Sequence, residues 1–477
     1  MKIRLAGIGI IDDSSIEMNG LTVITGKNNS GKSTVGKAVY SVFDAVCYLE
    51  NKAYVDRLFY IWEKMNNLKE TLAVLRCLMV DKESNQIDYL ERYPSIKSLF
   101  ENREKLSLSS VESNMYLLLN ELQSFECPDI DGDRSVLRRY QLRYNPISDI
   151  SEFKSRIMLS VGEAIKKIDD VILFVNQDKD LSNYAKESVN QTLRLEFSQQ
   201  IQPVSVKREL SEFSASEDGR KIFDFSIEDN NVVSKDNSIF YGSDIKNVFL
   251  IDDPLAVEKK SEGFSWEFGE LFSDSKSVLN KNRVIAHGEK LRKSIISNNK
   301  TILEQVSLNE SIKGIKEKID SIVPGRCEFG GVDDYYVQGG SKLKFSNLAT
   351  GAKFFSIIKS LLEEGLVDNS TILIFDEPES HLHPDWQVIA AEIIVLLVKE
   401  LGVRVLLTTH SSSFVLALDA FSRKYQIVGS TNFYNTVYNS DGSVKYLNVD
   451  DDINVIYKDF LNSVIRAKVL RDEYLEK

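Results

Sequence analysis

The spacing of hydrophobic residues separates segments of strand character from segments of helix character. Leu21 to Thr25 is a short apolar, β-branched run typical of a buried strand, and a turn at Asn19-Gly20 separates it from an earlier strand. Two more apolar runs, Thr371 to Phe375 and Val403 to Leu407, flank a helical segment from about Trp386 to Leu401. Strand, helix and strand at this spacing predict parallel pairing in an α/β sheet.

A long helical region interrupts these strands. From residue 41 to residue 189 hydrophobic positions recur at helical spacing, which predicts a helical insertion, and the lack of sustained heptads argues against a long coiled coil. Strands return near residue 190. The predicted organisation is an α/β head from residues 1–40, 190–275 and 323–440, the insertion 41–189, a helical segment 276–322 with a basic patch, and a helical tail 441–477.

The overall charge and hydropathy exclude several classes of protein. Lys and Arg number 59 and Asp and Glu number 71, so the formal net charge of −12 excludes a globally basic nucleic-acid coat. No run approaches the roughly eighteen apolar residues that span a membrane. The four cysteines are too widely spaced for a zinc site or a disulfide framework. We therefore expect a cytoplasmic protein that does not enter a membrane.

A glycine-rich segment follows the strand at residues 21–25. Gly26-Lys27-Asn28-Asn29-Ser30-Gly31-Lys32-Ser33 fits the pattern G-x-x-x-x-G-K-[ST], and a predicted helix begins at about Lys32. Its glycines let backbone N–H groups surround phosphate oxygens, and a helix N-terminus favours an anion. Lys32 can reach the β- and γ-phosphates of ATP, and the Ser33 hydroxyl can bind Mg²⁺. The predicted nucleotide-binding residues are Gly26, Asn28, Asn29, Ser30, Gly31, Lys32, Ser33 and Thr34.

Polar residues end both of the later strands. Asp376 and Glu377 directly follow the run at 371–375, and His410 follows the run at 403–407. Because parallel strands end at one edge of a sheet, we expect Asp376 to hold Mg²⁺ or its water, and Glu377 to orient and polarise the attacking water. His410 can hydrogen-bond the γ-phosphate or that water. The alternative for His410 is a polar residue in an ordinary strand-to-loop turn.

With these motifs in this order, the sequence resembles ABC-type ATPase heads, and more narrowly the RecF, SMC and OLD-like group. The string from Asp376 to Gln387, DEPESHLHPDWQ, is similar to that of free-standing ATPase subunits of anti-phage systems such as Septu, PARIS and some retrons. The resemblance covers residues 1 to about 40 and about 190 to 440. It implies an ABC ATPase head with a mainly parallel sheet, an antiparallel β portion and a large helical insertion.

The resemblance also implies an activity and an assembly. Such a head hydrolyses ATP with Mg²⁺, and a homo-oligomer of at least two protomers closes around the nucleotide. The expected role is a sensor or scaffold subunit that controls a separate effector protein in anti-phage defence. One alternative is a RecF-like DNA-repair or DNA-clamp ATPase. The other is a structural ATP-binding module with little turnover.

Two further site residues follow from the resemblance. Leu348-Ala349-Thr350-Gly351-Ala352-Lys353 stands where such heads carry a signature loop, so Gly351 is expected at the γ-phosphate of the partner's nucleotide. Ala349 replaces the serine of that loop, and the alternative is a polar loop that opens a core helix. Gln200, or else Gln199, is expected to link Mg²⁺ to the insertion; the alternative is a solvated turn.

Local charge leaves nucleic acid open as a partner. The segment Lys276 to Lys300 holds seven Lys or Arg residues against Glu289 alone, which suits nucleic acid, an acidic partner or simply a solvated helix face. Four arginines between Arg134 and Arg143, interleaved with Tyr140, suit single-stranded nucleic acid or a packed helix. The acidic run at residues 450–452 predicts a solvated turn before a final helix rather than a two-metal nuclease site.

Overall fold

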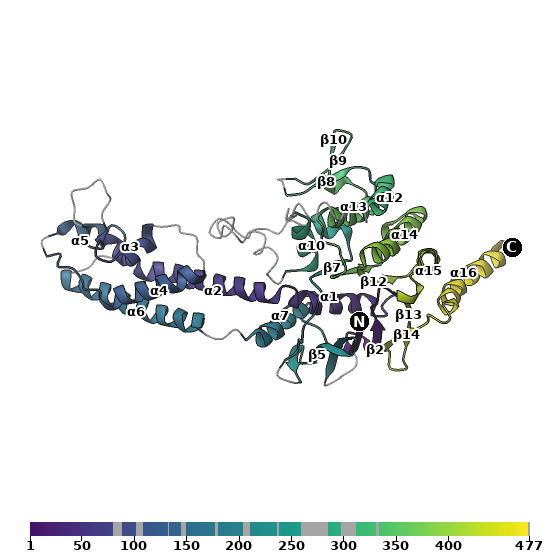
Figure 1. The fold of residues 1–477 in the computed structure, drawn as a ribbon, viewed down its shortest axis with the longest axis horizontal. Helices are drawn as coiled ribbons and strands as arrows, with labels where there is room; N and C mark the ends of the chain where they lie inside the picture. The colour runs from purple at the N-terminus through teal and green to yellow at the C-terminus, as the bar shows by residue number, and fades with distance from the viewer. Residues whose placement is uncertain are drawn as a thin grey trace. The chain divides into compact units, whose positions relative to one another are not determined.

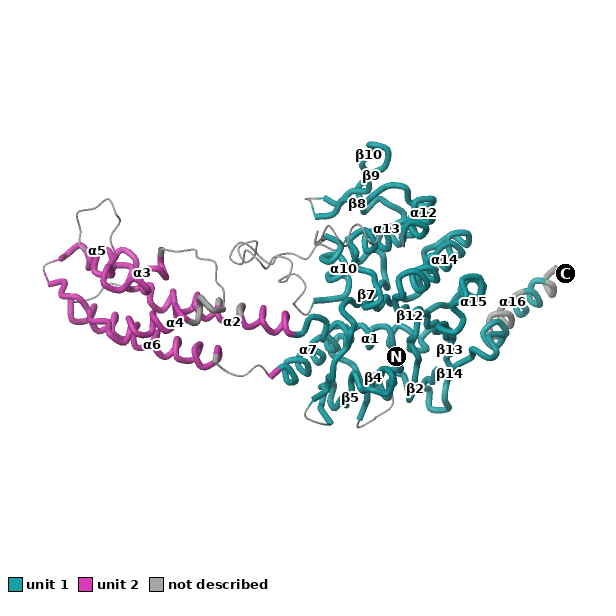
Figure 2. The backbone as a smooth tube through the Cα atoms, in the orientation of Figure 1, with its two compact units in different colours: residues 1–49, 181–262, 283–477 teal, residues 50–180, 263–282 magenta. Residues whose placement is uncertain are grey.

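The computed structural model of the whole chain comprises two compact units (Figure 2). The first unit comprises residues 1–49, 181–262 and 283–477, and the described part of the second comes from residues 50–180. The described residues are 1–79, 88–101, 108–131, 133–144, 149–176, 180–203, 210–235, 238–258, 285–296, 312–330 and 333–475.

A mixed sheet of eleven strands within the described residues forms the centre of the first unit (Figure 1). From edge to edge the strands are β6 (Asn231–Ser234), β5 (Arg220–Glu228), β4 (Ser211–Glu217), β1 (Lys2–Ile8), β2 (Ile11–Glu17), β14 (Val444–Asn448), β13 (Thr431–Tyr438), β3 (Leu21–Thr25), β12 (Arg404–Thr409), β11 (Thr371–Asp376) and β7 (Asn247–Ile251). The strands from β13 to β7 run parallel, and β6 to β2 pair antiparallel. The structure therefore confirms the predicted α/β class with a parallel and an antiparallel portion.

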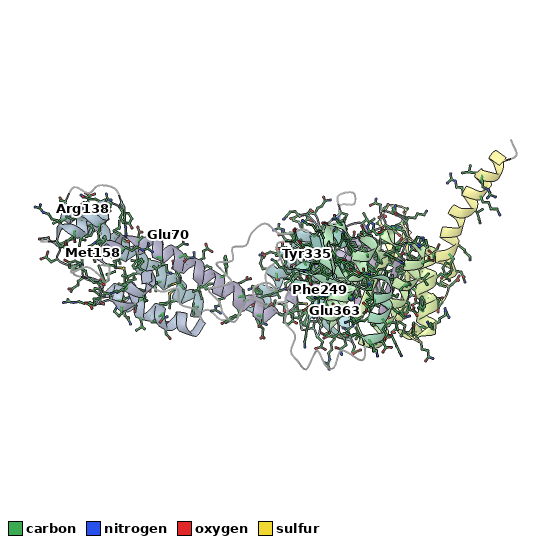
Figure 3. The ribbon with its side chains drawn as sticks, turned by 90° about the horizontal axis from the view of Figure 1, so that it is seen from above. Glu70, Arg138, Met158, Phe249, Tyr335 and Glu363 are labelled. Carbon is green, nitrogen blue, oxygen red and sulfur yellow. The ribbon has the colours of Figure 1, made fainter. Side chains whose placement is uncertain are left out.

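Helices cover both faces of this sheet. Because side chains alternate along a strand, Ile372 and Ile374 of β11 join one core, and Leu373 and Phe375 join the other. Phe249 of β7 is buried in the second core (Figure 3). The first core contains α1 (Lys32–Val46) and α7 (Leu181–Glu196); the second contains α10 (His287–Ile296), α12 (Lys313–Ile322), α13 (Thr350–Glu363), α14 (Pro384–Leu401) and α15 (Ser412–Lys424).

Shorter elements complete the first unit. A separate antiparallel sheet of three strands comprises β8 (Arg326–Glu328), β9 (Tyr335–Gln338) and β10 (Ser341–Lys344). The 3₁₀ helices are η2 (Pro254–Glu258), η3 (Phe345–Asn347), η4 (Pro378–His381) and η5 (Val428–Ser430). The final helix is α16 (Asn454–Leu475), and the acidic residues 450–452 lie in the turn region before it, as predicted.

The second unit is helical and has its own hydrophobic core. Tyr140 is buried in this core and makes an edge-to-face contact with Phe153. The sequence left two interpretations of the segment around Tyr140, a surface for single-stranded nucleic acid and a packed helix, and this ring is packed. Arg138 is exposed on the same unit (Figure 3). The elements are α2 (Leu49–Thr71), η1 (Leu72–Leu78), α3 (Pro94–Glu101), α4 (Leu108–Gln123), α5 (Arg134–Gln141) and α6 (Ile150–Asn176). Among the described residues no helix is long and apolar enough to cross a membrane.

The boundaries differ from the predicted ones at three places. The helical unit begins at Glu50 rather than at residue 41, because α1 and α7 pack together in the first unit, where Ser188 Oγ donates to the Ala45 carbonyl at 2.9 Å. Residues 2–17 form two strands rather than one, since the left-handed Gly9 (φ 54°) permits a tight hairpin turn. Finally, β14 belongs to the sheet, so the helical tail begins at Asn454 and not at residue 441.

The described cations of the predicted basic segment do not form a free patch. Lys290 pairs with Asp44, and Lys293 pairs with Glu289 at 2.6 Å. Arg292 is 7% exposed and its guanidinium lies 2.7 Å from Asp334. These three charges therefore have partners within the unit, which counts against one of the three alternatives for this segment, a surface for nucleic acid. Lys276, Lys281, Arg283 and Lys300 lie outside the described residues.

Candidate active site

The predicted site residues meet where the parallel strands end. Asp376 at the end of β11 pairs in register with Thr408 of β12, and Thr409 pairs with Thr25 of β3. β3 leads directly into the glycine-rich loop at Gly26. Sequence segments more than 300 residues apart therefore place polar groups at one edge of the sheet, which is where α/β sheets bind ligands.

The glycine-rich loop has the backbone of an anion site. Gly31 (φ 75°) and Asn29 (φ 60°) are left-handed, and Gly31 is the N-cap of α1 without any side-chain cap. The first N–H groups of α1 are thus not capped by a side chain, and no acidic residue lies in its first turn. Ser33 and Thr34, the second and third residues of α1, are half-buried. The loop and helix are arranged as the sequence predicted.

Lys32 lies inside this loop. Its ammonium donates to the Gly26 carbonyl at 3.2 Å and to the Lys27 carbonyl at 2.7 Å, and only 3% of the residue is exposed. Burial lowers its pKa, because a low-dielectric site disfavours the charged form. Three carboxylates oppose this shift and so lie within electrostatic reach of Lys32: Glu377, Asp376 and Glu379.

The two adjacent carboxylates have separate partners. The Thr408 hydroxyl donates to Asp376 Oδ1, and the Glu377 N–H donates to the Thr408 carbonyl at 3.1 Å. Glu377 is left-handed (φ 51°, ψ 50°), a conformation that costs a non-glycine residue about 1 kcal/mol. His410 Nε2 lies 2.6 Å from Glu377 Oε1. The structure thus brings Asp376, Glu377 and His410 together at the strand ends.

A third carboxylate, Glu379 of η4, was quoted in the sequence motif but given no role there. It is 6% exposed, and its Oε1 accepts bonds from the Thr409 hydroxyl and from the His410 N–H, the latter at 2.9 Å. Its other oxygen, Oε2, is buried and has no hydrogen-bond partner among the described residues. Burial raises the pKa of Glu379. Glu379 fixes the backbone of His410, and the His410 ring in turn contacts Glu377.

Gln387 of α14 ties the same two segments together. Its Nε2 donates to the carbonyls of Glu379 at 3.3 Å and Leu382 at 3.2 Å. Its Oε1 accepts from the Ser411 and Ser413 hydroxyls at 3.4 Å each. The Gln387 side chain therefore links the segment that follows β11 to the segment that follows β12. The sequence predicted no role for Gln387, because its partners Ser411 and Ser413 lie 24 and 26 positions away and come near only in the fold.

Gly351 lies in the first turn of α13, where the sequence predicted a helix start. The N-cap Ala349 is exposed and makes no side-chain cap bond. Gly351 itself is buried, and a Cβ atom there would lie 2.9 Å from the His381 carbonyl and 3.2 Å from the Trp386 ring. The close packing of α13 on η4 within one protomer thus explains why position 351 is a glycine, without any contact to a partner's nucleotide.

Gln200 lies in the exposed turn that follows α7. Ser198 (φ 49°) and Gln199 (φ 71°) are left-handed there, and the Gln200 N–H donates to the Phe197 carbonyl at 2.9 Å. Among the contacts of the described residues, none joins the Gln200 side chain to Asp376. The geometry of this turn matches the predicted alternative of a solvated turn, and a magnesium ligand at Gln200 remains a proposal.

Comparison with protein families identifies the group. A family model described as "AAA ATPase domain" matches residues 1–415, which is most of the chain. The chain belongs to this AAA ATPase domain family. Membership makes it an ATP-binding ATPase. Among curated proteins, no match to the sequence is found.

Solved structures similar to this AAA ATPase domain protein include several SMC heads. The SmcHead bound to the C-winged helix domain of ScpA is 11% identical, with 94% of this chain and 96% of that chain covered and a TM-score of 0.39. The SMC head domain from Thermotoga maritima is 10% identical, with 94% and 98% covered and a TM-score of 0.33. The Smc head with a coiled coil and joint from Pyrococcus yayanosii is 11% identical, with 96% and 98% covered and a TM-score of 0.33.

The residues present fit ATP and a magnesium ion. The uncapped start of α1 and the buried Lys32 suit the phosphates. No group of three or more His, Cys, Asp or Glu side chains among the described residues forms a metal cage. Mg²⁺ in nucleotide enzymes needs none, since it takes one or two protein ligands and completes its shell with phosphate and water. Ser33 and Asp376 are the residues of this site that would hold it.

Proposed function

We propose that the chain is a Mg²⁺-dependent ATPase that hydrolyses ATP at the edge formed by β3, β11 and β12. Lys32 and the N–H groups of the glycine-rich loop bind the phosphates, and Ser33 and Asp376 hold the metal. Bound Mg²⁺ neutralises developing phosphate charge. Glu377 accepts a proton from the attacking water, and His410 orients its carboxylate. Glu379 positions the backbone of His410.

One observation supports this proposal more than any other. The carboxylate of Glu377, in contact with His410 at 2.6 Å, lies within electrostatic reach of the buried ammonium of Lys32. A proton acceptor and a phosphate-binding cation are thus held together by a fold that joins the first and last thirds of the chain. That arrangement is the one needed to activate water beside a γ-phosphate.

The decisive experiment uses Lys32→Ala. We expect loss of ATP binding at micromolar nucleotide and loss of hydrolysis, measured by equilibrium titration and phosphate release. Lys37→Ala, which removes a cation from the same helix outside the loop, is the matched control and should bind ATP normally. Undiminished ATP binding by Lys32→Ala rejects the proposed site. ATP binding that needs Lys32 but is followed by negligible turnover of the wild-type protein would favour the structural ATP-binding module.

The proposed assembly is a homo-oligomer, at least a dimer, whose protomers close around ATP. Its support is the resemblance to ABC-type heads together with the exposed, uncapped start of α13 at Ala349, which precedes Gly351. A slowly hydrolysing Glu377→Gln protein should then increase in mass when ATP is added, measured by light scattering. A mass that is the same with and without ATP would contradict closure.

The proposed setting is control of a separate effector protein in anti-phage defence, with a RecF-like DNA ATPase as the alternative. The first rests on the similarity of the string from Asp376 to Gln387 to such subunits. The pairing of Lys290, Arg292 and Lys293 within the protein removes one argument for the second. Affinity purification from the native host should recover a stoichiometric partner protein. Recovery of DNA alone, with ATP-dependent DNA binding by the pure protein, would favour the alternative.

A further inference from the structure

Two tyrosines of the β13–β14 hairpin contact the outside of the glycine-rich loop. The Tyr438 hydroxyl lies 3.2 Å from the carbonyl oxygen of Asn28 and 3.1 Å from that of Asn29. The Tyr446 hydroxyl donates to the Gly31 carbonyl at 2.7 Å. Tyr446 is buried, with 6% of its surface exposed, whereas Tyr438 is 44% exposed. A hairpin from near the end of the chain therefore places two hydroxyl donors against three carbonyls of a loop near its beginning.

Holding these carbonyls also directs the amides of the loop. In a planar trans peptide the C=O and the following N–H point in opposite directions. Fixing the carbonyls of Asn28 and Asn29 toward the hairpin therefore turns the N–H groups of Asn29 and Ser30 away from it. The Gly31 carbonyl also accepts from the Val35 N–H at 3.3 Å, so Tyr446 and α1 together orient the N–H of Lys32. A phosphate bound by this loop needs those N–H groups on its own side. The tyrosines thus contribute to the anion site without touching the anion.

The hairpin is itself firmly held. β13 pairs in parallel with β3, the strand from which the loop emerges, with Asn435 opposite Thr25. At the turn of the hairpin, Asn439 Nδ2 and Lys445 Nζ both contact the carboxylate of Asp12, at 3.1 and 3.2 Å. The tyrosine side chains therefore extend from a backbone that is fixed to β3 and to β2.

The hairpin also approaches the first glycine of the loop closely. A Cβ atom at Gly26 (φ 152°) would lie 1.6 Å from Oγ1 of Thr436, so only glycine allows this approach. The contacts from Thr436, Tyr438 and Tyr446 together follow the loop from Gly26 to Gly31.

We propose that the β13–β14 hairpin is an outer brace that holds the glycine-rich loop in its phosphate-binding conformation, with Tyr438 and Tyr446 as positioning residues. This inference rests on the proposed nucleotide site. Without the hydroxyls the loop samples conformations in which its amides do not converge. Binding of ATP and ADP then weakens, while the bound complex, once formed, hydrolyses ATP at its usual rate.

The test compares Tyr438→Phe and Tyr446→Phe with Tyr434→Phe. Tyr434 lies on β13, as Tyr438 does. Its hydroxyl, however, accepts a bond from the Glu17 N–H at 2.9 Å rather than contacting the glycine-rich loop. We expect each of the first two variants to raise the Kd of Mg-ATP and of Mg-ADP about three- to tenfold, as the loss of one hydrogen bond predicts, with kcat at saturating ATP unchanged. Tyr434→Phe should bind ATP with the wild-type Kd.

A second readout separates positioning from general stability. In the nucleotide-free protein, the peptide covering residues 26–33 should exchange its amide hydrogens faster in Tyr438→Phe, with the midpoint of thermal unfolding unchanged. If Tyr446→Phe fails to fold, the exposed Tyr438→Phe decides. Wild-type Kd values in Tyr438→Phe, or equal weakening in Tyr434→Phe, overturn the brace. If Lys32→Ala loses ATP while the tyrosine variants keep it, the brace is wrong and the nucleotide site stands.

Discussion

Nε2 of His410 lies 2.6 Å from Oε1 of Glu377, although 33 positions separate the two residues in the sequence. The contact exists because β11 and β12 are parallel neighbours that end at the same edge, with Asp376 opposite Thr408. The imidazole contacts one of the two carboxylate oxygens of Glu377. The pair therefore connects the ends of β11 and β12 at the edge of the sheet where the proposed site lies.

Replacing Glu377 by Gln should slow ATP turnover strongly and leave nucleotide binding intact. The amide keeps the shape of the side chain but cannot accept a proton, so hydrolysis should fall by about two to four orders of magnitude. Steady-state phosphate release and an ATP titration measure the two effects. Asp376 and Lys32 are unchanged in this variant, so the Kd of Mg-ATP should stay within about twofold. Wild-type turnover would reject Glu377 as the base.

Glu379 should affect the rate of hydrolysis rather than binding. Glu379→Ala removes the acceptor for the His410 N–H, so we expect kcat to fall at least about tenfold while the Kd of ATP is kept. Glu379→Gln retains one acceptor oxygen and should recover much of the rate. The matched control is Glu392→Ala, because Glu392 is also buried but binds Lys318 and Lys424 away from the site. A similar loss of kcat in the control would show that Glu379 acts only through stability.

Gly351 calls for an experiment that separates a shared site from packing within one protomer. Gly351→Asp places a carboxylate near His381, and it should abolish hydrolysis in either case. Mixing it with Lys32→Ala protein distinguishes the two. If Gly351 completes the partner's site, one of the two sites in the mixed dimer carries neither change, and phosphate release should recover in part. If the substitution instead displaces η4 beside its own Glu377, mixing recovers nothing.

Stability should depend on pH through His287. Burial opposes protonation of its ring, but hydrogen bonds to Asp252 and Glu196 outweigh burial and raise its pKa from 6.5 to about 9. Protonated His287 therefore stabilises the folded state. Its contribution is complete below pH 6.5 and is lost as the pH rises through 9. The free energy of unfolding should fall by up to about 3 kcal/mol across this window. Denaturant titrations at several pH values measure it.

The control for this prediction is His287→Gln, which keeps hydrogen-bonding capacity without a titrating ring. Its free energy of unfolding should be lower than that of the wild-type protein at pH 6.5 and should change less between pH 6.5 and 9. Equal slopes in the two proteins would mean that other groups produce the dependence.

The sequence by itself determined the elements with local signals. The glycine-rich loop, the helix that begins at Lys32, and the strands before Asp376 and His410 each follow from a short run of residues whose backbone preferences agree. The α/β class and the meeting of three motifs at one edge followed from the parallel order of these strands. Such features depend on residues close together in the chain, so pattern and spacing suffice to predict them.

Only the tertiary structure decided which distant residues support the site. Glu379 binds the backbone of His410, and Tyr446 binds Gly31 across 415 positions of chain. Lys290 was predicted in a basic patch but pairs with Asp44, because α10 packs near α1. Whether a polar side chain meets solvent, a ligand or another side chain depends on what folding brings beside it. The residues adjacent to a polar side chain in the sequence therefore do not predict which group it will contact in the folded protein.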